Sequence, residues 1–372
     1  MNFEFSDEQL MLREQARGFL GQQCPPQAVR AVLDGEQDYD AKLWRGIADM
    51  GWTATAIPEA YGGLGLGYYE LAIIAEELGR AVAPVPFSSS VYLATEAILA
   101  FGTEAQKARW LPGLASGELI GTWAMAEGPG RATAESLKTQ WADGELKGCK
   151  TPVADGLIAN LAVIVAVRDG APCLAVVELN DAGVLAESVR TLDFSRGHAE
   201  LTLNSAAAEC LGDRAIDWSD IEHLMDRAAV LFAWEQLGVA ETALEQACDY
   251  AKQRYAFGRP IGSFQAIKHK LAGMYVKNAL ARSNAYHGAW ALASSDSALT
   301  LAAATARVAA IQASLHATQE NVHTHGGMGF TWEFDCQFYY RRAKLLSLAM
   351  GSERHWQNRL VDALQAQHTT AA

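Results

Sequence analysis

The chain has 372 residues, of which half are hydrophobic and a fifth are charged, and its formal net charge is -13. This composition is typical of a globular protein, and the length favours two or three domains over one small core. The acidic balance argues against nucleic acid or an anionic membrane as the main partner, because either would require a basic face. A small-molecule enzyme and a protein that docks to a basic patch both remain compatible with it.

Targeting and redox signals are few in this sequence. The six cysteines are scattered without a CxxC pair, and the first residues are acidic where a secretory signal would be basic. The longest strongly apolar run, residues 161–167, is too short to span a bilayer. We therefore expect reduced thiols in a cytoplasmic protein without a nucleic-acid or membrane partner.

Residues 1–120 have the periodicity of helices. Ser6, followed by two acidic residues and Gln9, predicts the N-cap of the first helix. Further helices are expected over residues 71–82 and from Thr103, the latter closed near Pro112. A glycine-rich loop at residues 62–65 lacks the GxGxxG order of a dinucleotide-binding turn, so we interpret it as a structural turn.

Residues 121–212 change to short apolar runs separated by turn residues. Asp143-Gly144 and Asp169-Gly170 each separate two such runs, which indicates hairpins. Residues 200–204 alternate between polar and apolar. Strands with this spacing predict a small antiparallel barrel or sandwich.

Residues 213–372 are again helical. A long helix is expected from about residue 226, where apolar residues recur with a 3.6-residue period, and it is ended by Gly258 and Pro260. A basic, aromatic turn therefore joins it to the next helix. The predicted fold is mostly α with a small β domain: an N-terminal helical domain (1–120), a middle antiparallel β-barrel (121–212) and a C-terminal four-helix bundle (213–372).

Five motifs follow one another along the chain. Together they resemble the acyl-CoA dehydrogenase family over nearly the whole length, although each motif alone is weak. They are residues 58–63 (PEAYGG), 102–118 (GTEAQKARWLPGLASGE), 254–265 (RYAFGRPIGSFQ), 325–333 (HGGMGFTWE) and 341–344 (RRAK).

The resemblance implies FAD bound across a subunit boundary and α,β-desaturation of an acyl-CoA substrate, with electrons passing to an electron-transfer flavoprotein. A flavin diphosphate needs a fixed cation and accessible backbone N–H groups, which arginine and glycine provide. The turn could also be an ordinary interhelical loop, and its phenylalanine a core aromatic. The cofactor-binding residues implied by the resemblance are Arg254, Phe257, Gln265, His323, Gly326 and Gly327.

The sequence departs from the family pattern where chemistry is expected. Met350 occupies the position of the usual catalytic Glu, and a thioether cannot accept the α-proton of a substrate. Ala228 occupies the alternative position of the base. Residues 126–133 lack the Ser-Asp pair of the usual isoalloxazine-contacting loop, and His323 replaces a glutamine.

Two residue sets offer alternatives to this interpretation. Glu235 lies two helical turns after Ala228, so it is either a substitute base or a packing residue of its helix. His316, His323 and His325 could be taken as metal ligands, but no carboxylates cluster with them in sequence. We expect no metal site.

The retained and missing motifs predict a subunit of a heteromeric acyl-CoA dehydrogenase, in which a diverged chain pairs with a paralogous catalytic one. Such enzymes occur in bacterial lipid or steroid catabolism as heterotetramers. The alternatives are a self-sufficient homomeric dehydrogenase with a relocated base such as Glu235, and a non-catalytic scaffold. A flavin monooxygenase is more distant, because no motif requires oxygen chemistry.

Overall fold

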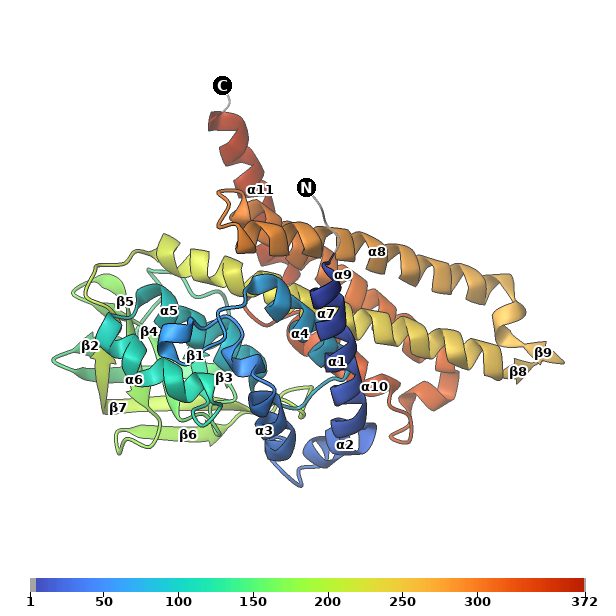
Figure 1. The fold of residues 1–372 in the computed structure, drawn as a ribbon, viewed down its shortest axis with the longest axis horizontal. Helices are drawn as coiled ribbons and strands as arrows, with labels where there is room; N and C mark the ends of the chain where they lie inside the picture. The colour runs from blue at the N-terminus through green and yellow to red at the C-terminus, as the bar shows by residue number, and fades with distance from the viewer. Residues whose placement is uncertain (1–4, 371–372) are drawn as a thin grey trace. The chain divides into compact units, whose positions relative to one another are not determined.

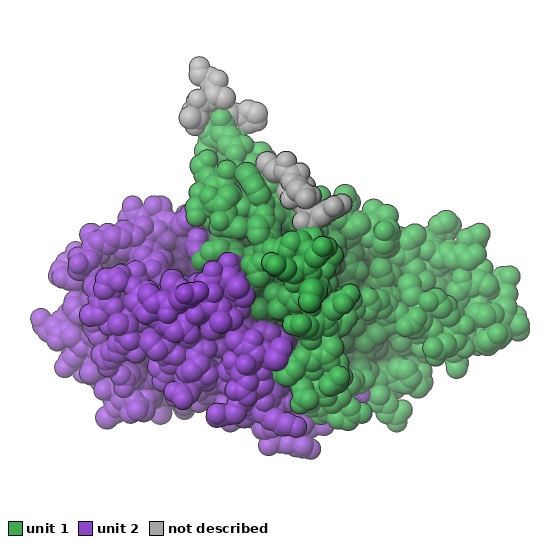
Figure 2. All heavy atoms as spheres, in the orientation of Figure 1, with its two compact units in different colours: residues 1–29, 68–83, 229–372 green, residues 30–67, 84–228 purple. Residues whose placement is uncertain are grey.

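The computed structural model describes residues 5–370, with side chains described up to residue 367 (Figure 1). The chain divides into two compact units, which Figure 2 colours separately. Unit 1 comprises residues 1–29, 68–83 and 229–372, and unit 2 comprises residues 30–67 and 84–228. Each unit is therefore built from segments that are distant in sequence, and the three-domain division by sequence order stays a prediction.

Unit 2 combines short helices with all the longer strands. Its helical elements are α3 (Ala41–Asp49), η1 (Trp52–Ala54), η2 (Glu59–Tyr61), η3 (Ser88–Thr95), α5 (Glu96–Phe101) and α6 (Glu104–Ala115), while α2 (Pro26–Leu33) and α7 (Trp218–Gln253) cross its boundary. Thr103 and Gln106 form a capping box at the start of α6, as the sequence predicts. The helix ends later than expected, since it continues through Pro112.

Five strands of unit 2 form a closed barrel. The sheet of this unit has seven strands in all, namely β1 (Gly121–Ala124), β2 (Gln140–Ala142), β3 (Glu145–Ala154), β4 (Leu161–Arg168), β5 (Ala171–Glu178), β6 (Val184–Ser188) and β7 (His198–Cys210). The ring runs β4-β2-β3-β7-β5 and closes through a β4–β5 pairing, with β1 attached to β4 and β6 attached to β7. Both predicted Asp-Gly hairpins are present, because Asp143 and Asp169 and the glycines that follow them all have positive φ.

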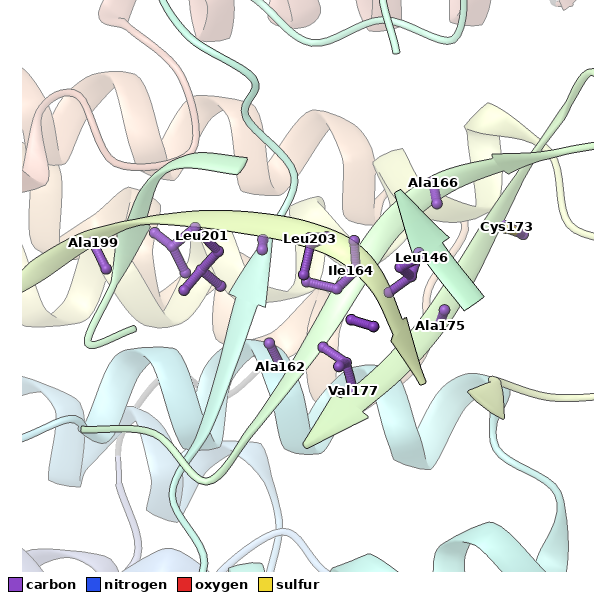
Figure 3. Packing of buried hydrophobic residues seen from close by; sticks show 13 residues of the cluster. Leu146, Ala162, Ile164, Ala166, Cys173, Ala175, Val177, Ala199, Leu201 and Leu203 are labelled. Atoms are coloured by element: carbon purple, nitrogen blue, oxygen red, sulfur yellow. The ribbon is translucent and has the colours of Figure 1, made fainter. Parts of the chain in front are cut away.

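The expectation of a purely antiparallel barrel is wrong in one respect. β1 pairs with β4 in parallel, and so does β2 at a single position. The long connection from β1 to β4, which contains the β2–β3 hairpin, allows the two strands to run in the same direction. The barrel interior is nonetheless a continuous apolar cluster, in which Leu146, Ile164, Val177, Leu201 and Leu203 point between the strands (Figure 3).

Unit 1 is helical. Its elements are α1 (Asp7–Gln23), α4 (Tyr68–Arg80), most of α7, β8 (Tyr255–Ala256), β9 (Arg259–Pro260), η4 (Ile261–Ser263), α8 (Gln265–Ala293), α9 (Leu299–His325), η5 (Gly326–Phe330), α10 (Cys336–Leu346) and α11 (Glu353–Thr370). The predicted N-cap of α1 is confirmed, with a complete capping box between Ser6 and Gln9. α8 packs on α9, which also contacts α10 and α11. α1 and α4 belong to the same compact unit as these helices, and the four-helix bundle expected for residues 213–372 stays a prediction.

α4 and α7 approach so closely that their backbones touch. A Cβ atom at Gly79 would lie 1.9 Å from the carbonyl oxygen of Glu235, and one at Gly238 would lie 2.0 Å from that of Glu76. Neither position can accept a side chain unless the helices separate. The Glu235–Gly238 stretch is thus a contact surface of α7.

Ion pairs add to this packing around α4. Glu76 is fully buried and accepts hydrogen bonds from Arg282 of α8 at 2.6 Å and from Arg13 of α1 at 3.5 Å. Its neighbour Glu77 accepts from Nε and Nη2 of the Arg17 guanidinium at 3.0 and 2.7 Å. A buried carboxylate is stable only when paired in this way.

No helix among the described residues is long and apolar enough to cross a bilayer.

Candidate functional site

The turn between α7 and α8 is a two-residue β-hairpin rather than an irregular loop. β8 and β9 pair through Ala256 and Arg259, and the connecting residues Phe257 and Gly258 have φ values of 53° and 78°. Two positive φ values are typical of a type I′ turn, which normally carries Asn or Gly at its first position. Phe257 is 96% exposed at this position, so it is not a core aromatic of unit 1.

Arg254 precedes the hairpin and is fixed by its backbone. Its N–H donates to the Tyr250 carbonyl at 2.8 Å, and its carbonyl accepts from Ile261 N–H at 2.8 Å. The side chain is exposed, and its guanidinium has no hydrogen bond or ion pair within the part of the chain that the structure describes. Gln265, which begins α8, is also exposed. The hairpin thus presents an unneutralised cation, which is suited to a phosphate or carboxylate.

The double-glycine loop follows the end of α9. Gly326 has φ 61° and ψ -137°, a conformation that only glycine adopts readily. A Cβ atom at Gly326 or Gly327 would meet nothing within 4 Å, so the backbone there is open to a ligand. The predicted His323 is partly exposed, and its Nδ1 lies 3.6 Å from Glu320 Oε1.

An aromatic stack brings these two loops to one end of unit 1. Tyr250, one turn before Arg254, stacks on His325 with ring centroids 4.2 Å apart and an interplanar angle of 27°. His325 directly precedes Gly326 and is buried, with Nδ1 2.9 Å from the Asn321 carbonyl. Burial lowers the pKa of His325, which favours the neutral imidazole in the stack. Figure 1 shows the ends of α7 and α9 on the same side of the unit.

The segment at Met350 is held by a buried arginine. Arg307 of α9 has no exposed surface and donates hydrogen bonds to the Leu346 carbonyl, to the Ala349 carbonyl at 2.8 Å and to Gln236 Oε1. A cation at the C-terminal carbonyls of α10 is favoured by the helix dipole. Burial still lowers the pKa of Arg307 to about 9. Met350 follows this cap with φ 63°, so the segment is fixed although it carries no carboxylate.

Glu235 is the counter-ion of a second buried arginine. Its Oε1 lies 3.4 Å from Arg342 Nη1, and both side chains are almost fully buried. Arg342 also donates to the carbonyls of Val82 and Ala83, which lie just after the end of α4. Neither Glu235 nor Met350 lines the cavity of about 300 Å³ that unit 1 contains between α1, α4, α7 and α10. Ala228 is fully buried in α7.

In unit 2, the loop at residues 126–133 is organised around Glu127. Its carboxylate accepts from Lys150 Nζ at 2.8 Å and from the N–H groups of Lys138 and Thr139 at 2.7 and 2.9 Å. Burial opposes ionisation, but these hydrogen bonds lower the pKa of Glu127. Lys150 is itself fully buried. The acid therefore stabilises the loop and the barrel, while the loop carries no Ser-Asp pair to meet a flavin ring.

Sequence reasoning missed three of these residues. Tyr250 and the buried role of Arg342 gave no local signal, because stacking and burial depend on helices that are distant in sequence. Arg307 did give a signal in the sequence, because it is the only charged residue in the Ala-rich stretch 299–319. Within residues 5–367, no group of three or more His, Cys, Asp and Glu side chains is arranged to hold a metal ion.

Comparisons with known proteins agree with this arrangement. The family models for the N-terminal and C-terminal domains of acyl-CoA dehydrogenase match residues 6–118 and 218–364. The chain is 34% identical over 356 residues to acyl-CoA dehydrogenase IpdE2 of Mycolicibacterium smegmatis, covering 95% of this chain and 98% of the relative. It is 32% identical over 342 residues to acyl-CoA dehydrogenase FadE27 of Mycobacterium tuberculosis, covering 88% and 89% of the two chains.

Solved structures show the same fold. Butyryl-CoA dehydrogenase from Megasphaera elsdenii superposes with a TM-score of 0.91 at 26% identity, over 98% of this chain and 100% of the other. A chain of the ChsE4-ChsE5 complex from Mycobacterium tuberculosis superposes with a TM-score of 0.90 at 28% identity, over 98% and 99%. The fold, the order of motifs and these relatives lead to one conclusion: the chain belongs to the acyl-CoA dehydrogenase family, whose members are oxidoreductases acting on CH–CH groups.

Proposed function

We propose that this chain is a subunit of a heteromeric, FAD-dependent acyl-CoA dehydrogenase and lacks the base of that enzyme. The reaction is the α,β-desaturation of an acyl-CoA thioester. The observation that carries the proposal is the Tyr250–His325 stack, because it brings the arginine-bearing hairpin and the double-glycine loop to one end of unit 1. Two loops far apart could not contact one nucleotide.

The residues at this end fit the adenine and diphosphate part of FAD. Arg254 offers a cation for a phosphate oxygen, and Gly326 and Gly327 allow a ligand to approach the backbone closely. Phe257 offers an exposed ring for apolar contact, with Gln265 beside the hairpin as a hydrogen-bonding group. When bound, FAD supplies the hydride acceptor of the desaturation.

No described side chain of unit 1 is placed to remove the α-proton at the usual positions. Met350 and Ala228 have no basic atom, and the carboxylate of Glu235 is held by Arg342. A general base needs a basic atom within hydrogen-bond reach of the proton that it abstracts. We therefore assign proton abstraction to a second chain, and electron exit to an electron-transfer flavoprotein.

The names of the relatives support such an assembly. One solved structure is the ChsE4-ChsE5 complex, and another, at 31% identity with a TM-score of 0.87, is described as the Tcur3481-Tcur3483 steroid ACAD G363A variant. Both pair two different chains. We infer a bulky, steroid-like or other lipid acyl-CoA as the substrate class and a heterotetramer as the assembly.

Expression of the chain alone and together with a paralogous acyl-CoA dehydrogenase chain from the same genome tests the proposal. We expect the chain alone to purify without stoichiometric flavin and without activity, and the pair to show flavin absorption and acyl-CoA-dependent bleaching. A yellow, active homo-oligomer of this chain would overturn the proposal. Loss of that activity in Glu235→Gln would then favour the self-sufficient enzyme, whereas absence of flavin from every complex would favour a scaffold.

A further inference from the structure

Unit 1 contains a cavity of about 300 Å³ that the proposed flavin contacts do not use. Its lining residues come from α1, α2, α4, α7, α10 and the segments next to them, and all of them belong to unit 1. Among the described residues that line it, none is one of the six predicted cofactor-binding residues. The volume is at the lower end of the range for small-molecule sites, which is roughly 300–1,000 Å³. The cavity can therefore hold a small molecule but not a whole CoA thioester.

One part of the lining is apolar and rigid. It includes four buried side chains, namely Leu20, Val29, Val82 and Phe338. Val82, just after α4, has a φ of 49°, which is strained for a β-branched residue. Two backbone hydrogen bonds hold this conformation, from Val82 N–H to the Gly79 carbonyl at 3.1 Å and from Ala83 N–H to the Leu78 carbonyl at 3.0 Å. Strained backbone that is held in this way is typical of ligand-binding sites.

Another part of the lining is a carboxylate shared by two arginines. Glu77 is buried, accepts from Nε and Nη2 of Arg17, and lies 3.7 Å from Nε of Arg80. Nη2 of Arg80 donates to Glu245, an exposed residue that does not line the cavity, at 2.5 Å. Nη1 of Arg17 and Nη1 of Arg80 have no hydrogen bond to any residue that the structure describes. These two groups are therefore available to a ligand in the cavity that both arginines line.

These charges select among ligands. An amine without a carboxylate would place its cation beside two guanidiniums, and like charges at a binding site are unfavourable. An uncharged apolar molecule would remove the free N–H groups from water without giving them a partner. A carboxylate accepts hydrogen bonds from guanidinium groups with good geometry.

We propose that this cavity binds a small monocarboxylate with an apolar body. The carboxylate accepts hydrogen bonds from Arg17 and Arg80, and the body of the ligand packs on the four apolar side chains. Asp335, the N-cap of α10, also lines the cavity and offers an acceptor to an ammonium group if the ligand is an amino acid. The inference does not depend on the proposed heteromer or on flavin, because none of these residues contributes to either proposal.

Isothermal titration calorimetry with three probes on one branched skeleton tests the ligand class, using the purified chain alone and within its complex. Isocaproate carries only the carboxylate, isoamylamine only the ammonium group, and leucine both. We expect a dissociation constant of about 1 mM or tighter for isocaproate and no measurable binding of isoamylamine. Leucine then identifies the source of the carboxylate: tighter binding than isocaproate would assign an amino acid held by Asp335, and weaker binding would assign a free acid.

Two glycines of α1 provide a matched pair of variants. Gly21 lines the cavity and Gly18 does not, and a Cβ atom at either position would meet nothing within 4 Å. Leucine is also a better helix former than glycine, so both variants should fold. We expect Gly21→Leu to fill part of the cavity and weaken isocaproate binding at least tenfold, whereas Gly18→Leu should bind like wild type. Arg17→Lys keeps a charge beside Glu77 but removes Nη1, and should weaken binding about tenfold.

The outcomes separate this inference from the proposed function. Isoamylamine binding as tightly as isocaproate, or no binding of either carboxylate, would overturn the monocarboxylate site. Undiminished binding by Gly21→Leu would place the ligand elsewhere and overturn it as well. None of these results bears on whether a flavin-containing heteromer forms. Thermal unfolding of each variant without ligand would show that α1 is intact.

Discussion

The two units of this chain differ in charge and in what they retain of the family pattern. Unit 2 contains 26 Asp and Glu against 14 Lys and Arg, whereas unit 1 contains 17 against 16. Unit 1 keeps the arginine-bearing hairpin and the double-glycine loop, while the loop of unit 2 at residues 126–133 has lost its Ser-Asp pair. A flavin diphosphate and a CoA are both anionic, so the net negative charge of unit 2 disfavours the approach of either ligand. Unit 2 nevertheless keeps the motifs at residues 58–63 and 102–118, and unit 1 has Met350 in place of the usual Glu, so each unit retains part of the family pattern.

The largest loss of stability is expected at Gly79, where unit 1 has no space for a side chain. Gly79→Val would force a side chain against the Glu235 carbonyl oxygen, which lies 1.9 Å from an ideal Cβ. We expect a loss of at least about 4 kcal/mol in the free energy of unfolding, or failure to fold. Gly327→Ala, where a Cβ atom meets nothing within 4 Å, is the control and should unfold in denaturant near the wild-type midpoint.

A comparable test in unit 2 removes a buried cation. Arg196 donates to Asp155 Oδ2 at 2.6 Å and to Ser88 Oγ at 2.9 Å, and both members of the ion pair are buried. Arg196→Met leaves Asp155 uncompensated and should cost about 3–5 kcal/mol in urea unfolding. The double variant Arg196→Met/Asp155→Leu should recover part of that loss, and no recovery would mean that the cost arises from packing and not from the stranded charge.

The role of the hairpin is tested by Arg254→Gln. Loss of one charged hydrogen bond to a phosphate should weaken flavin binding in the complex by about 10–100-fold, which corresponds to about 1.5–3 kcal/mol. The unfolding midpoint of the chain alone should not change, because the guanidinium has no partner among the described residues. The measurement is the flavin retained after gel filtration, with Arg354→Gln on α11 as the control. Equal retention by both variants would remove Arg254 from the flavin site.

A smaller effect, on the pH dependence of stability, is expected in unit 2 at acidic pH. The folded-state pKa of Glu127 lies below its ordinary value of 4.5, so its contribution is fully present above that pH and is lost as the pH falls through the folded pKa. Glu127→Gln should therefore flatten the dependence of unfolding free energy on pH below 4.5, relative to Glu36→Gln on the exposed surface. An unchanged slope would show that Glu127 is not held in its ionised form by Lys150 and Thr139.

Sequence reasoning was successful where the determinants are local. Capping residues such as Ser6 and the Asp-Gly turns specify conformations over three or four residues, and these features are present in the structure. The parallel β1–β4 pairing was missed because the sequence of a strand does not determine whether its neighbour runs parallel or antiparallel to it. The burial of Arg307 was missed for the same reason, since the end of α10 and the segment after it supply the carbonyls that accept its hydrogen bonds. The residues that we propose to contact flavin were predicted by motif, whereas the stack between the two loops that carry them is visible only in the fold.

The discontinuity of unit 1 has a consequence for biosynthesis. α1 and α4 emerge from the ribosome roughly 150 residues before the long helices that cover them, while unit 2 is nearly complete by residue 228. During that interval the apolar side of α4, with Leu71, Ile74 and Leu78, has no helix of its own unit beyond α1 to pack on. A nascent chain stalled near residue 228 should therefore bind chaperones or aggregate. Synthesis of the last 140 or so residues should cover the apolar side of α4 and stop this binding or aggregation.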